Sequence, residues 1–270
     1  MNESEFLAAY DMSRYERPSV TADIAAFMMR SEQEDNYRKD ADAHLSLLLI
    51  RRGGHPFKNC WALPGGFLQR GETLEECAMR EIREETSVLP ISLMPVGVFS
   101  APNRDPRGWI ISGAFACVIS EQSVKPLFGD DAADAGWFDI DMHKTDDGRF
   151  ELILQKDEIR LCAILTEKNS RFGRKEFISE SSDFAFDHAQ IIASSLSALQ
   201  GCAESFEMIF GFLPEKFTLS ALQSVWQAAS GQAVQAANFR RKIAPFVEQT
   251  DEYESGAGHR PARLYKQKKG

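Results

Sequence analysis

The stretch Gly65–Val88, GGFLQRGETLEECAMREIREETSV, decides how this chain folds. The two glycines at its start follow a proline and interrupt any preceding strand. Thr73, with Glu76 three residues later, has the pattern of a helix N-cap that forms a capping box. The sequence therefore predicts a helix that begins just after Thr73.

The predicted helix has three carboxylates where a packed helix keeps apolar side chains. Its core-facing stripe begins with Leu74, Cys77 and Ala78, and one heptad later the same stripe reaches Glu81, Glu84 and Glu85. Burying such carboxylates unpaired would cost on the order of several kcal/mol each, so a cation should neutralise them. Their hard oxygen atoms suit Mg²⁺, with Mn²⁺ as the alternative. Taken alone, the glutamates favour a solvated acidic helix with arginine partners.

The spacing of the flanking residues favours a cation-binding helix over a solvated acidic helix, because the whole stretch resembles the Nudix box. The matching residues are Gly66, Glu72, Arg80, Glu81, Ile82, Glu84, Glu85 and Val88. Ser87 stands where the family has a glycine, which ends the helix in a left-handed conformation that costs serine roughly 1 kcal/mol. The resemblance implies an α+β protein with the Nudix fold, a mixed sheet sandwiched between helices.

The resemblance also implies an activity and a set of site residues. We expect a Mg²⁺-dependent hydrolase of a nucleoside diphosphate linked to another group, with ADP-ribose as the leading substrate and AMP and ribose 5-phosphate as products. Arg80 and Glu72 should pair and orient the helix. The expected metal ligands are Gly65 through its carbonyl, Glu81, Glu84 and Glu85.

Charged residues outside the box are further candidates. Arg52, after a predicted strand, could pair with phosphate oxygens or lie in a solvated turn. Arg104, Asp105 and Arg107 lie on a predicted turn that resembles a loop of Nudix proteins acting on ADP-ribose, and its two arginines could clamp an anion. The general base stays open between a box glutamate and Asp131, with the neighbouring Asp130 next.

Length and composition are those of a globular protein with room for two domains. The chain has 270 residues, 43% hydrophobic and 26% charged. Its apolar runs are too short to span a bilayer, and its first residues lack a signal-peptide pattern. The five cysteines form no C-x-x-C pair and suggest neither a zinc site nor a disulfide framework. We expect a cytoplasmic protein with no membrane partner.

The first domain is predicted over residues 17–200. Strands are expected at residues 20–29, 45–50, 61–63, 94–100, 109–119, 136–140, 151–155 and 159–165. Strands, one long helix and further strands indicate an α+β layered domain. An amphipathic helix at residues 184–199 should close this domain, with His188 as a structural residue near its start.

The second domain, predicted over residues 205–270, has the element order of a winged helix-turn-helix. Thr218 is the expected N-cap of one helix and Gly231 its end, a basic helix follows from about Asn238, and a hairpin arm follows near Arg260. This segment resembles the C-terminal domain of Nudix-related transcriptional regulators and their enzymatic relatives. The alternative is a small domain that only packs against the first or mediates dimer contacts.

Net charge is distributed unevenly between the two ends of the chain. The whole chain carries -9, but the segment from residue 240 onward has eight Lys or Arg against four acids, about +4, which leaves about -13 for the remainder. Local positive charge allows approach to a phosphate backbone. The candidate DNA contacts are Arg240, Arg241, Lys242, Arg260 and Arg263.

Two functions of different classes follow from these patterns. One is the hydrolase, favoured because every metal ligand of the box is present. The other is a regulator in which the Nudix domain senses a nucleotide and the winged helix binds double-stranded DNA. Such a regulator is expected to be a homodimer, since a two-fold protein matches a palindromic site.

Overall fold

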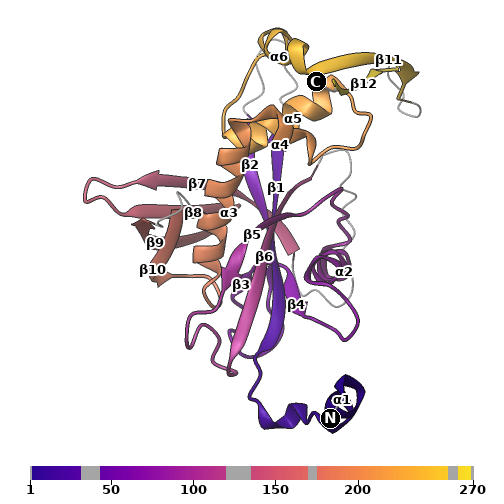
Figure 1. The fold of residues 1–270 in the computed structure, drawn as a ribbon. Helices are drawn as coiled ribbons and strands as arrows, with labels where there is room; N and C mark the ends of the chain where they lie inside the picture. The colour runs from indigo at the N-terminus through magenta and orange to yellow at the C-terminus, as the bar shows by residue number, and fades with distance from the viewer. Residues whose placement is uncertain (1, 32–42, 120–134, 170–174, 255–260, 269–270) are drawn as a thin grey trace.

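A mixed β-sheet forms the centre of the molecule (Figure 1). The computed structural model describes residues 2–31, 43–119, 135–169, 175–254 and 261–268. The strands are β1 (Ser19–Ser31), β2 (Ala43–Arg51), β3 (Trp61–Ala62), β4 (Gly65–Phe67), β5 (Met94–Phe99), β6 (Ile110–Val118), β7 (Ala135–Lys144), β8 (Phe150–Lys156), β9 (Ile159–Asn169) and β10 (Lys175–Ser182).

Strand β1 is the centre of this sheet. In the described part of the chain the order is β10-β9-β8-β7-β2-β1-β6-β5, with β3 paired to β2 and β4 paired to β1. The β1–β6 pair is parallel, whereas β1 runs antiparallel to β2 and β4. A strand enclosed on both faces should be apolar throughout, and β1 is buried from Thr21 to Met29.

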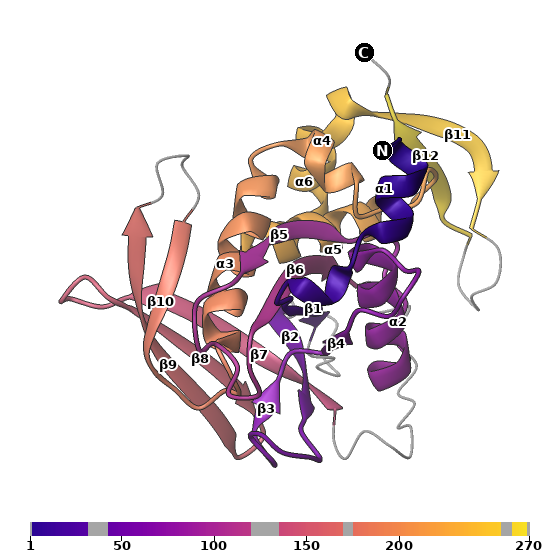
Figure 2. The same ribbon diagram turned by 60° about the horizontal axis from the view of Figure 1, so that its bottom comes forward.

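Helices cover both faces of the sheet, as Figure 2 shows. Successive β1 side chains point to opposite faces. Ile24 joins the apolar cluster beneath α2 (Leu74–Thr86), whereas Phe27 joins the cluster beneath α3 (His188–Ala203) and α5 (Leu219–Ser230). The expected sandwich of a mixed sheet between helices is confirmed.

The strands predicted from sequence are all present, and three features of residues 17–200 differ from expectation. A short strand, β4, forms at the glycines that were expected to interrupt strand structure, and it pairs with β1. Strand β10 was not predicted, although it pairs with β9 and adds an edge to the sheet. The closing helix begins at His188 instead of residue 184. Phe184 bridges to Trp61, and Phe186 has a φ of 52°, which a continuous helix does not allow.

A three-helix unit with a hairpin wing follows the sheet. Its elements are α4 (Phe206–Phe210), α5, α6 (Ala236–Ile243), a 3₁₀ turn (Ala244–Phe246), β11 (Val247–Tyr253) and β12 (Arg263–Gln267). Thr218 accepts the Ala221 N–H as the N-cap of α5, and Gly231 ends that helix with a φ of 65°. Both caps and the hairpin confirm the predicted winged helix. No helix in the described residues is long and apolar enough to cross a membrane.

The apolar core is continuous between the sheet and the winged helix. Leu222 and Val225 of α5 belong to the same buried cluster as Phe27 of β1. Figure 1 shows α5 near the end of β1, and α5 contacts α3, β1 and β6. Burial of a shared apolar surface couples the stability of the two units.

We predict that the two units unfold together. Leu222→Ala removes a fully buried side chain of the shared core and should lower the free energy of unfolding by about 2–5 kcal/mol. Chemical denaturation, followed separately by Trp61 and Trp226 in single-tryptophan variants, should show both probes shifting together. Met208→Ala, at a side chain that is 52% exposed, should leave both transitions in place. If Leu222→Ala shifted only the unfolding transition reported by Trp226 and left that of Trp61 in place, the shared core would be contradicted.

Candidate active site and DNA-binding surface

Local capping interactions set both ends of the box helix α2. The Thr73 N–H donates to Glu76 Oε2 at 2.7 Å, and the Glu76 N–H donates to Thr73 Oγ1 at 3.2 Å. Ser87 at the other end has a φ of 57°, and its N–H donates to the Arg83 carbonyl at 2.9 Å. Serine therefore occupies the left-handed position at which the box pattern has glycine. The predicted capping box and helix end are confirmed.

Arg80 connects the carboxylates at the solvent side of α2. Its Nε and Nη2 donate to the two oxygens of Glu72 at 3.1 and 2.7 Å, a bidentate pair. Its Nη1 donates to Glu81 at 2.6 Å and lies 3.3 Å from Glu84. The hydrogen bond from Arg80 lowers the pKa of Glu72 to about 2. The predicted Arg80–Glu72 pair is confirmed, and Arg80 balances part of the charge that the glutamates concentrate.

Two glycines let the box helix approach the sheet. A Cβ on Gly65 would lie 2.3 Å from the Ala22 carbonyl oxygen, and one on Gly66 would lie 2.4 Å from the Glu81 carboxyl group. The Gly65 N–H donates to Glu85 Oε2 at 2.9 Å. A side chain at position 65 would therefore require the backbone of β1 to move, whereas one at position 66 would displace the Glu81 carboxyl group from its present position.

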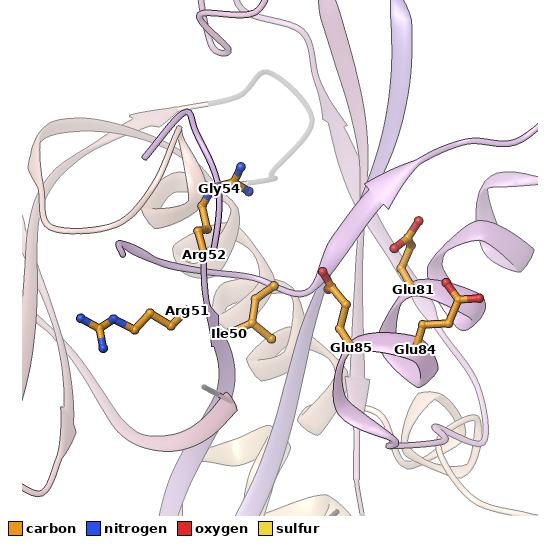
Figure 3. Close-up of a pocket in the computed structure, with 8 residues that line it drawn as sticks. Ile50, Arg51, Arg52, Gly54, Glu81, Glu84 and Glu85 are labelled. Carbon is orange, nitrogen blue, oxygen red and sulfur yellow. The ribbon is translucent and has the colours of Figure 1, made fainter. Parts of the chain in front are cut away.

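Glu81, Glu84 and Glu85 line one cleft together with Arg52 (Figure 3). The cleft has a volume of about 430 Å³ and continues along Gly53 and Gly54 after β2. Figure 3 shows the glutamates projecting from α2 on one side and the β2 end on the other, with Arg51 pointing away. A basic group and three acidic groups thus face a common space large enough for a phosphate compound.

The chemistry of the glutamates fits a divalent cation. The pKa of Glu85 is raised to about 7, first by burial and also by the nearby carboxylates Glu81 and Asp23. Local negative charge therefore exceeds local positive charge, and hard oxygen donors suit Mg²⁺. Within the described residues, no three Asp, Glu, His or Cys side chains are assembled around a common point. Glu81 is paired with Arg80, and Glu85 is bonded to the Gly65 N–H.

Arginines alternate with aromatic rings beside this cleft. The Arg52 guanidinium lies 4.8 Å from the Phe186 ring centroid, and the Arg107 guanidinium lies 5.3 Å from it on the same ring. Arg107 also lies 4.9 Å from the Phe67 ring. These residues line a second cavity of about 140 Å³ that adjoins Gly65. The arrangement offers cations and flat apolar surfaces to one ligand.

The turn expected to clamp an anion has both arginines in ion pairs. Arg104 is buried, and its Nε and Nη2 donate to Asp187 at 2.9 and 2.6 Å. Arg107 makes a bidentate pair with Asp105, at 3.0 Å from Nε and 2.6 Å from Nη2. Arg107 remains 37% exposed, whereas the Arg104 side chain is 4% exposed. Arg104 therefore connects this turn to Asp187, at the start of α3. Arg107 is the arginine of this turn that a ligand can reach.

A buried polar cluster behind the site was not found from the sequence. Arg104 Nη2 lies 3.6 Å from Asp23 Oδ2, to which the Ser112 hydroxyl also donates. His188 Nδ1 accepts the Leu63 N–H at 2.9 Å, and its Nε2 lies 3.7 Å from Asp23 Oδ1. Burial lowers the pKa of His188, so the neutral ring carries its proton on Nε2, toward Asp23. His188 is a structural residue at the start of α3, as predicted.

Two predicted site residues fall outside the described residues. Asp131, the candidate base, and Arg260, a candidate DNA contact, both lie there, as does Asp130. Their roles stay predictions.

The turn between α5 and α6 has the hydrogen bonds of a fixed helix-turn-helix. Gln223 Nε2 donates to the Val234 carbonyl at 2.7 Å, and the Val234 N–H donates to Gln227 Oε1 at 3.1 Å. The buried Phe239 and Ile243 anchor α6 to the domain. The opposite side of α6 is therefore presented to solvent in a fixed orientation.

The basic residues of this unit differ in their surroundings. Arg240 and Arg241 are exposed on α6, and Arg241 Nη2 donates to Asn238 at 2.5 Å. Lys242 is exposed as well, but its ammonium lies 4.0 Å from the Trp226 ring centroid. Arg263 of β12 donates to Gln249 and Tyr253 across the wing at 2.7 and 2.6 Å. Arg240 and Arg241 are thus directed outward, whereas Lys242 packs against its own domain.

The raised pKa of Glu85 predicts how stability depends on pH. The pKa is about 7 in the folded chain and about 4.3 in an unfolded one. The folded chain therefore holds a proton between these values, and the free energy of unfolding falls as pH rises through that window. In metal-free buffer the melting temperature of the parent should fall relative to that of Glu85→Gln between pH 5 and pH 8. The comparison isolates Glu85 from groups such as His188, whose lowered pKa acts in the opposite direction.

Adding Mg²⁺ at pH 8 should raise the melting temperature of the parent chain more than that of the variant, because a bound cation stabilises the ionised carboxylate. Calorimetry over this pH range measures both effects. Parallel pH profiles for the parent and Glu85→Gln would contradict the assignment.

Comparison with known proteins agrees with the geometry of both units. The NUDIX domain model matches residues 34–155, and the NrtR DNA-binding winged helix domain model matches residues 209–267. The chain is 27% identical over 269 residues to the ADPR responsive transcriptional repressor NtrR of Acinetobacter baylyi, covering 98% of this chain and 88% of that protein.

Two further relatives match different shares of the chain. ADP-ribose pyrophosphatase of Methanocaldococcus jannaschii is 49% identical over 94 residues, which are 35% of this chain and just over half, 54%, of that protein. The crystal structure of Shewanella oneidensis NrtR complexed with a 27mer DNA matches with a TM-score of 0.56 and 25% identity, over 92% of this chain and 93% of that one. The chain is therefore a NUDIX domain protein with a C-terminal NrtR-type winged helix domain.

Proposed function

We propose that the Nudix domain hydrolyses the diphosphate of a nucleoside diphosphate-linked compound, with ADP-ribose as the leading substrate. The observation that carries this proposal is the cleft in which Glu81, Glu84 and Glu85 face Arg52. A diphosphate is the ligand that both a cation held by carboxylates and a nearby guanidinium would bind. The similarity to an ADP-ribose pyrophosphatase across the box supports the same substrate class.

The three glutamates, with the Gly65 carbonyl, would hold Mg²⁺ or Mn²⁺. When bound, such an ion neutralises charge on the diphosphate and lowers the pKa of bound water. Glu72 and Arg80 would position α2 relative to the box loop. Arg80 pairs with Glu72 and donates to the Phe67 carbonyl, and these bonds hold the loop against the helix. Glu84, whose side chain is 60% exposed, is the glutamate most accessible to solvent water.

The arginines and aromatic rings beside the cleft would bind the rest of the substrate. Arg52 lines both cavities and can pair with phosphate oxygens at their junction. Phe67 is 41% exposed and presents a ring face on which a planar base can stack. Arg107 lies against this ring and is within reach of the same ligand. The site therefore joins a charged half for phosphate to a flat half for a base.

Release of AMP from ADP-ribose in the presence of Mg²⁺ tests this activity. We expect turnover on the order of 1 s⁻¹ or faster, and little from nucleoside monophosphates, which lack the diphosphate bond. Binding of ADP-ribose without release of AMP would contradict hydrolysis and leave a sensing role for the same site.

A second function, DNA binding regulated by the nucleotide, is favoured by the exposed basic residues of α6. Arg240 and Arg241 project from a helix whose other side is fixed in the domain core. The full-length similarity to a repressor described as ADPR responsive and to a structure solved with DNA supports this proposal. The α6 helix would enter the major groove, and Arg263 would contact backbone phosphate from the wing. Both functions can belong to one chain, because they use separate surfaces.

For hydrolysis we predict that Glu85→Gln lowers kcat/KM at least about 100-fold, beyond the 10- to 100-fold that indirect partners of a metal supply. Glu75→Gln is the matched control, because Glu75 is an exposed glutamate of the same helix, outside the cleft. AMP release measures both variants, and circular dichroism checks that each is folded. Near-parental activity of Glu85→Gln would show that this carboxylate does not hold the metal.

For DNA binding we predict that Arg240→Ala and Arg241→Ala each weaken binding to double-stranded DNA. If the removed guanidinium binds a phosphate, the slope of log binding constant against log salt concentration should also become shallower by about one unit. Arg160→Ala, at an exposed arginine of β9, is the control and should bind like the parent. Equal weakening in all three variants would indicate a nonspecific charge effect instead of a contact through α6.

A further inference from the structure

Lys242, in the last turn of α6, directs its ammonium group onto aromatic rings of its own domain. The ammonium nitrogen lies 4.0 Å from the ring centroid of Trp226 on α5 and 5.6 Å from that of Phe206 on α4. Both salt bridges in the described part of this unit use other lysines. The faces of the two rings are therefore the partners that the structure gives this cation.

The rings beneath Lys242 belong to an aromatic cluster that joins three helices. The ring centroid of Phe239, on α6, lies 5.8 Å from that of Trp226 and 6.5 Å from that of Phe206. Phe206 also lies 5.0 Å from Phe246, in the 3₁₀ turn after α6. Figure 1 shows α4, α5 and α6 gathered at the end of the molecule that carries the wing. Lys242 thus lies over a contact surface that all three helices share.

Trp226 meets Lys242 through the face of its indole ring. The residue is 5% exposed, and its Nε1 has no hydrogen-bond partner among the described residues. The N–H group therefore gives this position no bond that an aliphatic side chain would lack. Among aromatic side chains, indole attracts a cation most strongly through its face. The contact with Lys242 is what this ring adds to the packing of an ordinary core residue.

The buried side chains of α6 leave one motion of this helix weakly opposed. Phe239 and Ile243 are its two buried residues, and they lie one turn apart on one line along the helix. Contacts along a single line oppose the lifting of a helix more than its rotation about its own axis. Lys242 lies about 60° round the helix from Phe239, at the border of the buried face. A side chain held at that border opposes the rotation.

The two ends of α6 are attached to α5 by different interactions. Before the first turn, the Val234 carbonyl accepts from Gln223, and the Val234 N–H donates to Gln227. In the last turn, Lys242 reaches the Trp226 ring. A cation at this end also interacts favourably with the C-terminal carbonyl groups of the helix. The orientation of α6 relative to α5 is therefore set at both ends.

We propose that Lys242 is a positioning residue for DNA binding. Held on the two rings, its ammonium fixes the rotation of α6 about its axis and thereby the direction of Arg240 and Arg241. Arg241 lies about 160° round the helix from both buried residues, so rotation of α6 displaces its guanidinium directly. This role rests on the proposed DNA binding by α6, within which Lys242 becomes a support of the helix instead of a phosphate contact.

A phosphate contact and a positioning role differ in their effect on DNA binding. Removing a phosphate contact weakens binding to every sequence alike, and the slope of log binding constant against log salt concentration becomes shallower by about one unit. Removing a support of α6 leaves that slope in place. It weakens binding mainly to the preferred sequence, because hydrogen bonds to base edges depend on distance and angle.

The first test uses the full-length chain and a duplex that the parent enriches from a randomised DNA pool. Lys242→Met keeps an apolar stem and removes the charge. We expect it to weaken binding to the enriched duplex roughly 3- to 30-fold, the range of one cation–π contact, with the salt slope of the parent. Lys242→Arg, which retains a cation over the rings, should bind within about three-fold of the parent. Lys168→Met, at an exposed lysine of β9, is the control for loss of one charge and should bind like the parent.

Hydrogen exchange of the chain without DNA tests the support of α6 independently of DNA binding. Lys242→Met should speed exchange of the α6 backbone amides at least about three-fold and leave those of α3 unchanged. Lys242→Arg should keep the parental rates. In a Trp226→Phe background, where the ring has a weaker face, Lys242→Met should have a smaller effect, which assigns the effect to this pair. Circular dichroism checks that each variant is folded.

The two tests separate failure of this role from failure of DNA binding. If the parent enriches no sequence and binds no duplex, the proposed DNA binding fails, and exchange of α6 alone decides whether Lys242 holds the helix. Parental exchange of α6 in Lys242→Met would overturn the positioning role. Equal weakening on enriched and scrambled duplexes, with a slope shallower by about one unit, would also overturn it, because Lys242 would then bind phosphate.

Discussion

The buried ion pair between Arg104 and Asp187 is the interaction on which the arrangement of the site depends. These residues are 83 positions apart, and both side chains are nearly inaccessible to solvent. A charge buried without a partner would cost on the order of several kcal/mol, so each fixes the other. Because Arg104 also approaches Asp23, the pair joins the 101–108 turn, the start of α3 and the central strand β1. The box loop is held to the same cluster through Leu63 and His188.

This cluster explains why α3 matters to both units of the chain. The first turn of α3 carries His188 behind the nucleotide cleft, while its remaining turns pack against β10 and α5. Coupling between a ligand site and DNA binding requires an element with two states that both sites bias. Helix α3 is the element that contacts both units, through His188 at its start and the shared apolar core along its length.

Sequence predicted the parts that depend on local chemistry. The caps at Thr73, Ser87, Thr218 and Gly231 each involve nearby residues of the same helix, so their patterns were sufficient. The Arg80–Glu72 pair was predicted because the box spacing fixes it. By contrast, no local signal links Arg104 to Asp187, and the expected anion clamp assumed that both arginines of the turn face solvent. Such features arise from the topology of the sheet, which brings distant segments together.

The charge balance of the box helix bears on whether hydrolysis and sensing can share one site. The three closely spaced glutamates are tolerated without a metal because Arg80 pairs with Glu81 and the Gly65 N–H bonds Glu85. Burial first, and then the nearby carboxylates Glu81 and Asp23, still raise the pKa of Glu85 to about 7. A domain that only sensed a nucleotide could replace Glu85 with an uncharged residue and gain stability, since that carboxylate destabilises the fold at neutral pH. At the metal site proposed above, a bound cation would offset this cost by stabilising the ionised carboxylate.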